Sequence, residues 1–235
     1  MNQTMKQWIA NRIGKISIAG MAAVLLFGTA SAASAMVWSE GRPLIQTRDV
    51  AGSGVFDELD GPAEQAEFRH PAGVLVLGDG SVLVADSGNH RIRLIRDGMV
   101  SVYAGIPVSV VFDDAGLPAG ALNDGPADLS LFWNPVGLAA DRHGNIYVAD
   151  AANHAIRKIS PSGEVATLAG NGTLGHGDGP GGEALFHYPM DVAVDDEGNV
   201  YVADTLNHAI RKITPQGKVT TLNALSTRAV EAYDG

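Results

Sequence analysis

Residues 145–159 read Asn-Ile-Tyr-Val-Ala-Asp-Ala-Ala-Asn-His-Ala-Ile-Arg-Lys-Ile, and close copies of this stretch occur once upstream and once downstream. The phrase Asn-His-x-Ile-Arg begins at Asn89, Asn153 and Asn207, and each copy follows Val-Ala-Asp at the same offset. Self-similarity of this kind is typical of repeat architectures. Any chemistry assigned to these residues would have to be needed three times, so a structural role explains the triplication more simply.

The repeat extends well beyond this phrase. Each unit reads Asp-Gly-Pro, then a phenylalanine, a proline and a turn glycine, then Val-Ala-Asp and Asn-His-x-Ile-Arg, and ends in a further apolar run. The equivalent Asp residues of Val-Ala-Asp are 64 and then 54 residues apart. The extra residues fall in one loop, near residues 106–120, which indicates an insertion between the first and second units.

Within each unit the apolar residues form short runs rich in Val, Ile, Leu and Tyr, separated by Gly, Pro, Asp and Asn. This pattern predicts short strands joined by tight turns, and therefore a four-stranded antiparallel meander in each unit. Several strands are apolar on both faces, such as Val82-Leu83-Val84-Ala85. A sheet that is buried on both faces needs neighbours on both sides, which the radially stacked blades of a β-propeller provide.

The motifs Pro-x-Gly, Gly-Asn-x-Tyr-Val-Ala-Asp and Asn-His-x-Ile-Arg-Lys-Ile together make the chain resemble NHL-repeat β-propellers over residues 43–224. The Asp-Gly-Pro loop followed by Phe and Pro further resembles secreted bacterial members of that family. The resemblance implies an all-β propeller of four-stranded antiparallel blades, of the NHL or six-bladed type.

Three complete blades are expected, preceded by one orphan strand, and this count is below the four to eight blades that close a ring. We therefore expect the chain to be a fragment of a longer propeller, in which the last residues begin the next inter-blade loop. The alternative is a homodimer that makes a six-bladed ring. The expected divisions are the orphan strand at residues 44–51, the blades at 71–105, 135–170 and 189–224, and the loop at 225–235.

Residues 1–35 have the composition of a secretory signal peptide. Their only charges are three basic residues, an apolar run follows near residues 16–30, and Ala33-Ser34-Ala35 is a small-x-small cleavage site, with Ala30-Ser31-Ala32 as an alternative. An uncleaved anchor is the competing interpretation, but the run is shorter than the roughly 20 apolar residues of a spanning helix. We expect a secreted protein, extracellular or periplasmic, with no stable membrane span after cleavage.

The charge balance excludes one class of partner. Removal of residues 1–35 deletes three positive charges and no acids, which moves the net charge from −10 to −13. An acidic surface disfavours nucleic-acid binding, because that affinity depends on Lys and Arg. The chain has no cysteine, so disulfides, Cys-ligated metals and a lipid anchor through Cys are excluded.

The repeated polar residues are expected to be structural: the Asp residues, with their Asn and Arg partners, would cap the turn and bridge to the neighbouring blade. The positions are Asp86, Asn89, His90, Arg93, Asp150, Asn153, His154, Arg157, Asp204, Asn207, His208 and Arg211.

A zinc site formed by the three histidines is the alternative, and the peptidyl-hydroxyglycine lyase domain, a relative, uses zinc in an NHL-like ring. Here, however, the histidines match a repeat position. The Asp-Gly-Pro acids (Asp60, Asp124 and Asp178) would suit calcium, but the same sequence is a good turn. We expect no metal and no cofactor.

The positions where the repeats disagree are better candidates for binding, because the architecture does not dictate them. A varied dipeptide precedes the proline that opens each innermost strand, and it is expected at the mouth of the central channel, on the loop-rich face. The alternative is that these side chains fill gaps between blades. The candidates are Arg69, His70, Trp133, Asn134, His187 and Tyr188, with Phe112 and Asp113 of the inserted loop.

No hydrolase or metalloprotease motif is present, which favours a non-enzymatic role. The leading hypothesis is a secreted scaffold that binds a protein, peptide or glycan through the loop-rich face. The first alternative is a metal-dependent lyase or hydrolase built on the same ring. The second is a structural spacer for a missing C-terminal module.

Overall fold

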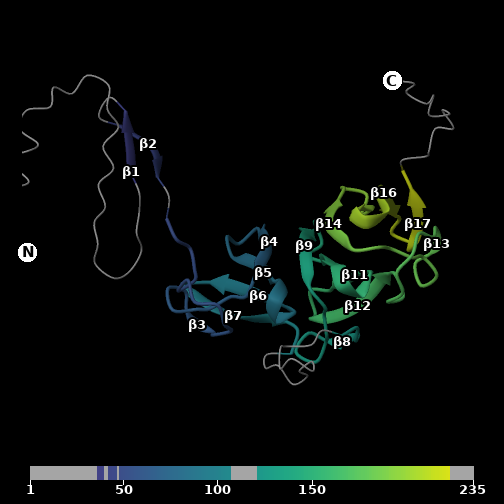
Figure 1. The fold of residues 1–235 in the computed structure, drawn as a ribbon, viewed down its shortest axis with the longest axis horizontal. Coiled ribbons are helices and arrows are strands. Elements are labelled where there is room, and N and C mark those ends of the chain that lie inside the picture. The colour runs from purple at the N-terminus through teal and green to yellow at the C-terminus, as the bar shows by residue number, and fades with distance from the viewer. Residues whose placement is uncertain (1–35, 40–41, 47, 107–120, 223–235) are drawn as a thin grey trace, which may run out of the picture. The chain divides into compact units, whose positions relative to one another are not determined.

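The computed structural model describes residues 36–39, 42–46, 48–106 and 121–222 and divides the chain into two units, Met1–Val50 and Ala51–Gly235. In the first unit, β1 (Met36–Ser39) pairs antiparallel with β2 (Arg42–Gln46) (Figure 1). The orphan strand expected at residues 44–51 therefore lies earlier, in a hairpin, and residues 48–51 form no strand. The proposed signal peptide, the inserted loop and the last residues lie outside the described ranges.

The second unit contains three antiparallel sheets, which we call blades 1, 2 and 3 (Figure 1). In each, four strands follow one another as a meander, and a two-residue strand pairs with the last of them. Blade 1 consists of β3 (Gly61–Pro62), β4 (Pro71–Val76), β5 (Val82–Asp86), β6 (Arg91–Arg96) and β7 (Met99–Ala104). Blade 2 consists of β8 (Gly125–Pro126), β9 (Pro135–Ala140), β10 (Ile146–Asp150), β11 (Ala155–Ile159) and β12 (Glu164–Ala169). Blade 3 consists of β13 (Gly179–Pro180), β14 (Pro189–Val194), β15 (Val200–Asp204), β16 (Ala209–Ile213) and β17 (Lys218–Thr221).

The two-residue strands are the feature that the sequence did not predict. The sequence predicts a loop at the Gly-Pro of each Asp-Gly-Pro, but Gly125 and Pro126 pair with Val165 and Glu164 at the outer edge of blade 2. Proline has no N–H to donate, so it is tolerated at an edge strand. Each blade is therefore five-stranded, and the chain passes from this outer edge to the innermost strand of the same blade.

The core lies between the blades. One cluster joins residues of blades 1 and 2, among them Leu83, Ile92 and Leu138, and a second joins blades 2 and 3. At the two ends of the stack, the described residues include no such neighbour: Val74, the counterpart of the buried Leu138, is 68% exposed. Ile210, the counterpart of the fully buried Ile92 and Ile156, is 47% exposed. The ring is not closed by these three blades.

Glycine in Pro-x-Gly is required by the close approach of the innermost strands. A Cβ atom on Gly73 would lie 2.0 Å from the carbonyl oxygen of Val136, and one on Gly137 would lie 2.5 Å from the Cα atom of Asp191. Any side chain at these positions would push adjacent blades apart. Blade 3 has Asp191 at the equivalent position, on a strand that no described blade follows.

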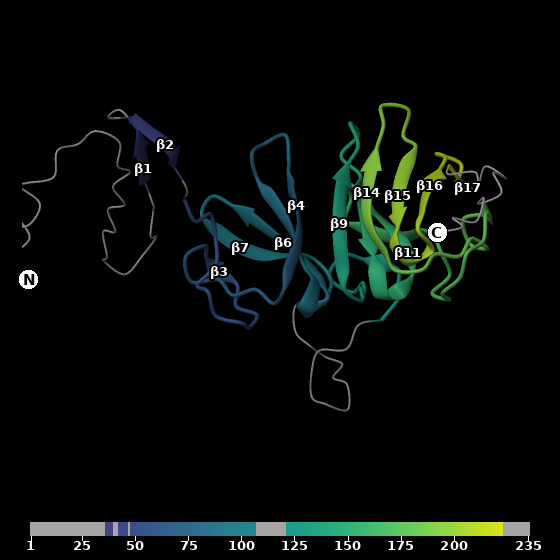
Figure 2. The ribbon, with the colours of Figure 1, turned by 45° about the horizontal axis from the view of Figure 1, so that its top comes forward.

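The blades carry different connections at their two ends (Figure 2). Tight turns join β4 to β5 and β14 to β15 at one end, which we call the turn face. At the other end, single turns of 3-10 helix join the second and third strands, and the long Asp-Gly-Pro loops lead to the next innermost strand; we call it the loop face. The 3-10 turns are η1 (Ser87–Asn89), η2 (Ala151–Asn153) and η3 (Thr205–Asn207).

Candidate functional site

A buried arginine organises the loop face of each blade. In blade 2, Arg157 is fully buried, and its Nη1 and Nη2 atoms lie 2.9 and 2.8 Å from carboxylate oxygens of Asp150 and Asp124. The same two nitrogens donate to the carbonyl oxygens of Leu131 and Asn123, each at 2.8 Å. The guanidinium thus ties the strand end to the Asp-Gly-Pro loop. Arg93 and Arg211 make the corresponding pairs with Asp86 and Asp60, and with Asp204 and Asp178.

The aspartates differ from the expected arrangement in two respects. Asp150 Oδ1 accepts from the backbone N–H of Trp133 at 2.7 Å, and Oδ2 accepts from the side chain of Asn153 at 2.9 Å. These partners all belong to the same repeat, and the side chain of Asp150 does not cap the 3-10 turn. The reason is geometric: Asp150 ends β10 opposite Pro135 of the innermost strand of its own blade, so its carboxylate lies within reach of the N–H of Trp133.

Burial and hydrogen bonding move the pKa of these acids in opposite directions. Burial raises the pKa of Asp150 to about 6, although Arg157 and Asn153 oppose the shift. Burial also raises the pKa of Asp86. For Asp124, burial acts in the same direction but is outweighed by hydrogen bonds from Thr167 and by Arg157, so its pKa is lowered. The outer acid therefore stays ionised over a wider pH range than the inner one.

The repeated histidines make the contact to the next blade. Each adopts the left-handed conformation after its 3-10 turn, with φ of 56° at His90 and 51° at both His154 and His208. His90 Nδ1 accepts from the backbone N–H of Asn134 at 3.0 Å, and His154 Nδ1 accepts from that of Tyr188 at 3.2 Å. Because Nδ1 is an acceptor in both contacts, the imidazole is neutral and carries its proton on Nε2.

These contacts predict a pH-dependent stability. The pKa of His154 is lowered by burial and by His187, while Asp204 opposes the shift. The contact made by neutral His154 contributes to the free energy of unfolding. Because the folded pKa lies below the ordinary value of about 6.5, this stabilisation is complete above pH 6.5 and is lost as the pH falls through the lowered pKa. His154→Asn keeps an acceptor and tolerates the left-handed backbone.

We therefore expect the free energy of unfolding of His154→Asn to fall less than that of the wild type between about pH 7 and pH 5. Urea unfolding at several pH values measures this difference. His143→Asn, at an exposed position, is the control and should follow the wild type. Parallel pH curves for the wild type and His154→Asn would contradict the assignment.

The six variable residues lie directly before the innermost strands, with their backbone held by the repeated groups; we call these six residues the rim. The first residue of each dipeptide donates its N–H to the repeated aspartate, and in blades 2 and 3 the second donates to the histidine of the preceding blade. The second residue is always left-handed, although it precedes a proline, with φ of 46° at His70, 54° at Asn134 and 55° at Tyr188. Non-glycine residues rarely adopt this conformation, and backbone strain of this kind collects at functional sites.

The rim side chains of blades 1 and 3 pack against neighbouring rings, and that of Trp133 in blade 2 is partly exposed. Arg69 lies over the ring of Phe56 with 4.7 Å to its centroid, and the ring of His70 is 4.8 Å from the same centroid. Trp133 is 46% exposed. His187 and Tyr188 lie against His154, at 5.8 and 5.9 Å between ring centroids. Phe112 and Asp113 fall outside the described residues.

The zinc alternative gains no support from the histidine geometry. The Nδ1 atoms of His90 and His154 already accept backbone N–H groups. Among the residues that the structure describes, no three His, Asp or Glu side chains lie close enough together to hold a metal ion.

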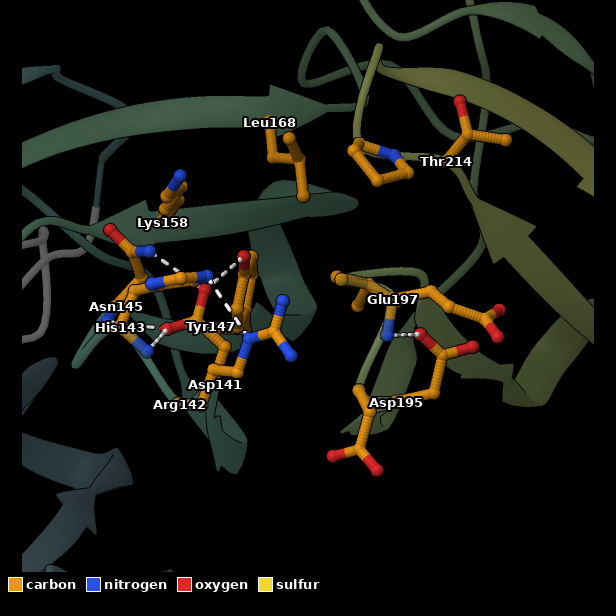
Figure 3. Close-up of a pocket in the computed structure, with 14 residues that line it drawn as sticks. Asp141, Arg142, His143, Asn145, Tyr147, Lys158, Leu168, Asp195, Glu197 and Thr214 are labelled. Atoms are coloured by element: carbon orange, nitrogen blue, oxygen red, sulfur yellow. Dashed lines mark hydrogen bonds between the residues drawn. The ribbon is translucent and has the colours of Figure 1, made fainter.

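A groove that the sequence did not predict lies on the turn face, between blades 2 and 3 (Figure 3). Its volume is about 230 Å³. One wall comes from the β9–β10 turn and the neighbouring strands, and the other from the β14–β15 and β16–β17 turns. Its lining includes Arg142, His143, Tyr147, Lys158, Leu168, Asp196, Glu197, Thr214 and Pro215.

Hydrogen bonds from a repeated Asp-Asn-Tyr set hold the turns that form the two walls of this groove. Asp141 accepts from the amide of Asn145 at 2.7 Å and from the hydroxyl of Tyr147 at 3.0 Å. Asp195 is bonded in the same way by Asn199 and Tyr201. Blade 1 has Leu77, Ser81 and Leu83 at these positions. The absence of the Asp-Asn-Tyr set from the first repeat is a signal that could have drawn attention to this face.

Sequence comparison identifies the repeats. The NHL repeat family matches residues 68–93, 132–159 and 186–213, so the chain contains three NHL repeats in a β-propeller-like fold. Among curated proteins, SUPPRESSOR OF QUENCHING 1 of Arabidopsis thaliana is 33% identical over 173 residues, covering 71% of this chain and 16% of the plant protein. NHL repeat-containing protein 2 of Bos taurus is 29% identical over 182 residues, covering 73% of this chain and 24% of the bovine protein. The chain thus spans a quarter or less of either relative.

One shorter match is to an enzyme: peptidyl-alpha-hydroxyglycine alpha-amidating lyase 1 of Drosophila melanogaster is 33% identical over 110 residues, covering 45% of this chain and 19% of the lyase. Among solved structures, an auxiliary nutrient binding protein of Bacteroides ovatus superposes with a TM-score of 0.54 at 19% identity, covering 81% of this chain and 43% of that protein. At that identity the likeness concerns the fold.

Proposed function

We propose that these NHL repeats form a ligand-binding scaffold that takes up a protein, peptide or glycan through the rim of the loop face. The observation that supports the proposal is that different residues hold the backbone of the rim and supply its exposed side chains. The repeated Asp and His residues hold the backbone, while the side chains they hold differ from blade to blade. Trp133, Tyr188 and Arg69 offer the aromatic and basic groups that are enriched at binding surfaces.

We further propose that the protein acts outside the cytoplasm, since residues 1–35 have the composition of a signal peptide. Among the described residues, no helix is long and apolar enough to span a membrane. N-terminal sequencing of the exported product tests this proposal. A product that begins at Met36 or Ala33 supports it, and retention of Met1 in a cell-associated protein contradicts it.

The binding role is tested by probing glycan and peptide arrays with purified protein and then repeating the measurement with Trp133→Ala. We expect at least one class of array ligand to bind and its signal to fall about tenfold in the variant, since interface aromatic residues often contribute more than about 1 kcal/mol. Met99→Ala, at a residue of similar exposure on β7, is the matched control and should keep the signal. Equal signals from both variants, or no binding to any array ligand, would contradict ligand binding through the rim.

The similarity to the Drosophila lyase favours a second candidate, a metal-dependent lyase or hydrolase on the same ring. Metal analysis of the purified protein separates the two. A stoichiometric ion that is lost in His154→Ala would favour the enzyme, whereas a metal-free protein that binds an array ligand would favour the scaffold.

A further inference from the structure

We propose that the groove between blades 2 and 3 is a second binding site, for short peptides with free amino and carboxyl termini. The groove lies on the turn face, opposite the rim, so this proposal is independent of the function proposed above. It concerns side chains that the repeat does not dictate: residues 141–143 read Asp-Arg-His, whereas the equivalent residues 195–197 read Asp-Asp-Glu.

The groove carries opposite charges on its two walls. Arg142 and Lys158 belong to blade 2, and Asp196 and Glu197 belong to blade 3. In the close-up, Arg142 and Lys158 appear on the opposite side from Glu197 (Figure 3). A ligand that lies between them meets the two cations on one side and the two carboxylates on the other. Asp141 and Asp195 also line the walls, but their carboxylates already accept hydrogen bonds from their own blades. A zwitterion matches this distribution, whereas a neutral sugar or a simple anion matches only part of it.

None of these four charges is used in an ion pair among the described residues. Arg142 Nε donates to His143 Nε2 at 3.3 Å, and the Nζ atom of Lys158 lies 5.9 Å from the ring centroid of Tyr147. Glu197 accepts one hydrogen bond, from Asn199 at 3.2 Å. The charged ends therefore retain donors and acceptors for a ligand.

The walls are built to hold these charges in place. The hydrogen bonds of Asp141 and Asp195 fix both turns, so the groove exists before a ligand binds, which lowers the entropic cost of binding. The hydroxyl of Tyr147 is bonded to Asp141, and burial together with that carboxylate raises its pKa to about 12. Tyr147 therefore stays neutral and presents its ring to Lys158.

The size and apolar lining favour a small peptide over a larger ligand. Leu168 and Pro215 supply apolar surface, and Leu168 also lines a second hollow of about 470 Å³ beside Gly179–Pro180. In this hollow, Gly181 and Gly182 replace the Ala-Glu of blade 1 and the Ala-Asp of blade 2. A Cβ atom on Gly182 would meet nothing within 4 Å, so the missing side chain at this position leaves room for an apolar side chain of the ligand. Gly181 is close-packed instead, since a Cβ atom there would lie 2.4 Å from the carbonyl oxygen of Leu168.

Calorimetry with the dipeptide glycyl-leucine tests the proposal. We expect the dipeptide with free termini to bind and its N-acetylated and C-amidated forms to bind about tenfold more weakly, because each form loses one charged contact. Arg142→Ala should remove the preference for the free carboxylate over the amide. Glu197→Gln should remove the preference for the free amine over the acetylated form.

Lys158→Ala and Lys212→Ala form the matched pair. Lys212 lies over Tyr201 at 5.6 Å, as Lys158 lies over Tyr147, but it does not line the groove. We expect Lys158→Ala to weaken binding about threefold to tenfold and Lys212→Ala to leave it unchanged. Three outcomes would overturn the proposal: no heat at about 5 mM dipeptide, equal binding of the free and capped forms, or equal weakening by the two lysine variants.

Discussion

Arg157→Met is expected to lower the free energy of unfolding by about 3–5 kcal/mol, the cost of removing one partner from a buried ion pair. The substitution leaves Asp150, which is fully buried, without its nearest cation, and it removes the Arg157 donor from the backbone carbonyl of Leu131. The carbonyl of Asn123 also loses the arginine but still accepts from the N–H of Leu131 at 3.2 Å. Methionine keeps the apolar contact with the ring of Phe132, over which the guanidinium lies at 4.9 Å. Urea unfolding followed by circular dichroism measures the difference.

The control for this experiment is Arg96→Met. Arg96 pairs with Asp79 at 2.8 Å, but both side chains are about half exposed, so the expected loss is below about 1 kcal/mol. Equal losses in the two variants would contradict a structural role for the repeated arginine. If Arg157→Met does not fold, Asp124→Asn reports on the same network, because it weakens only the outer, half-exposed pair.

The sequence was sufficient to predict the fold because each position of the repeat occurs three times, so the residues that recur at one position can be recognised as structural. Val-Ala-Asp and Asn-His-x-Ile-Arg gave the count of three blades and the four long strands of each, but neither the two-residue edge strands nor the place of the strand before blade 1. The structure adds what the motif residues do. Asp150 and Arg157 hold a blade to its own loop, and His154 holds it to the next blade.

The sequence was insufficient where a contact joins residues from different repeats. The edge strand at Gly125–Pro126 forms only because β12 offers a free edge about forty residues later, and no local pattern records that pairing. The groove on the turn face arises in the same way, since Arg142 and Glu197 belong to separate repeats and meet only after the blades stack. A turn composition predicts a turn but not the neighbour that it faces.

The second large expected effect on stability concerns the packing between blades. Ile156→Ala should lower the free energy of unfolding by about 2–5 kcal/mol, because Ile156 is fully buried in the cluster between blades 2 and 3, and the substitution leaves a cavity there. Ile210→Ala changes the same side chain at the same position of the next repeat, but Ile210 is 47% exposed, so the expected loss is below about 1 kcal/mol. Urea unfolding of both variants at low protein concentration separates the stabilisation that comes from packing between blades from the stabilisation that comes from the strand itself. Equal and large losses would mean that the outer face of blade 3 is covered in solution, and a concentration-dependent difference would identify a second copy of the chain as the cover.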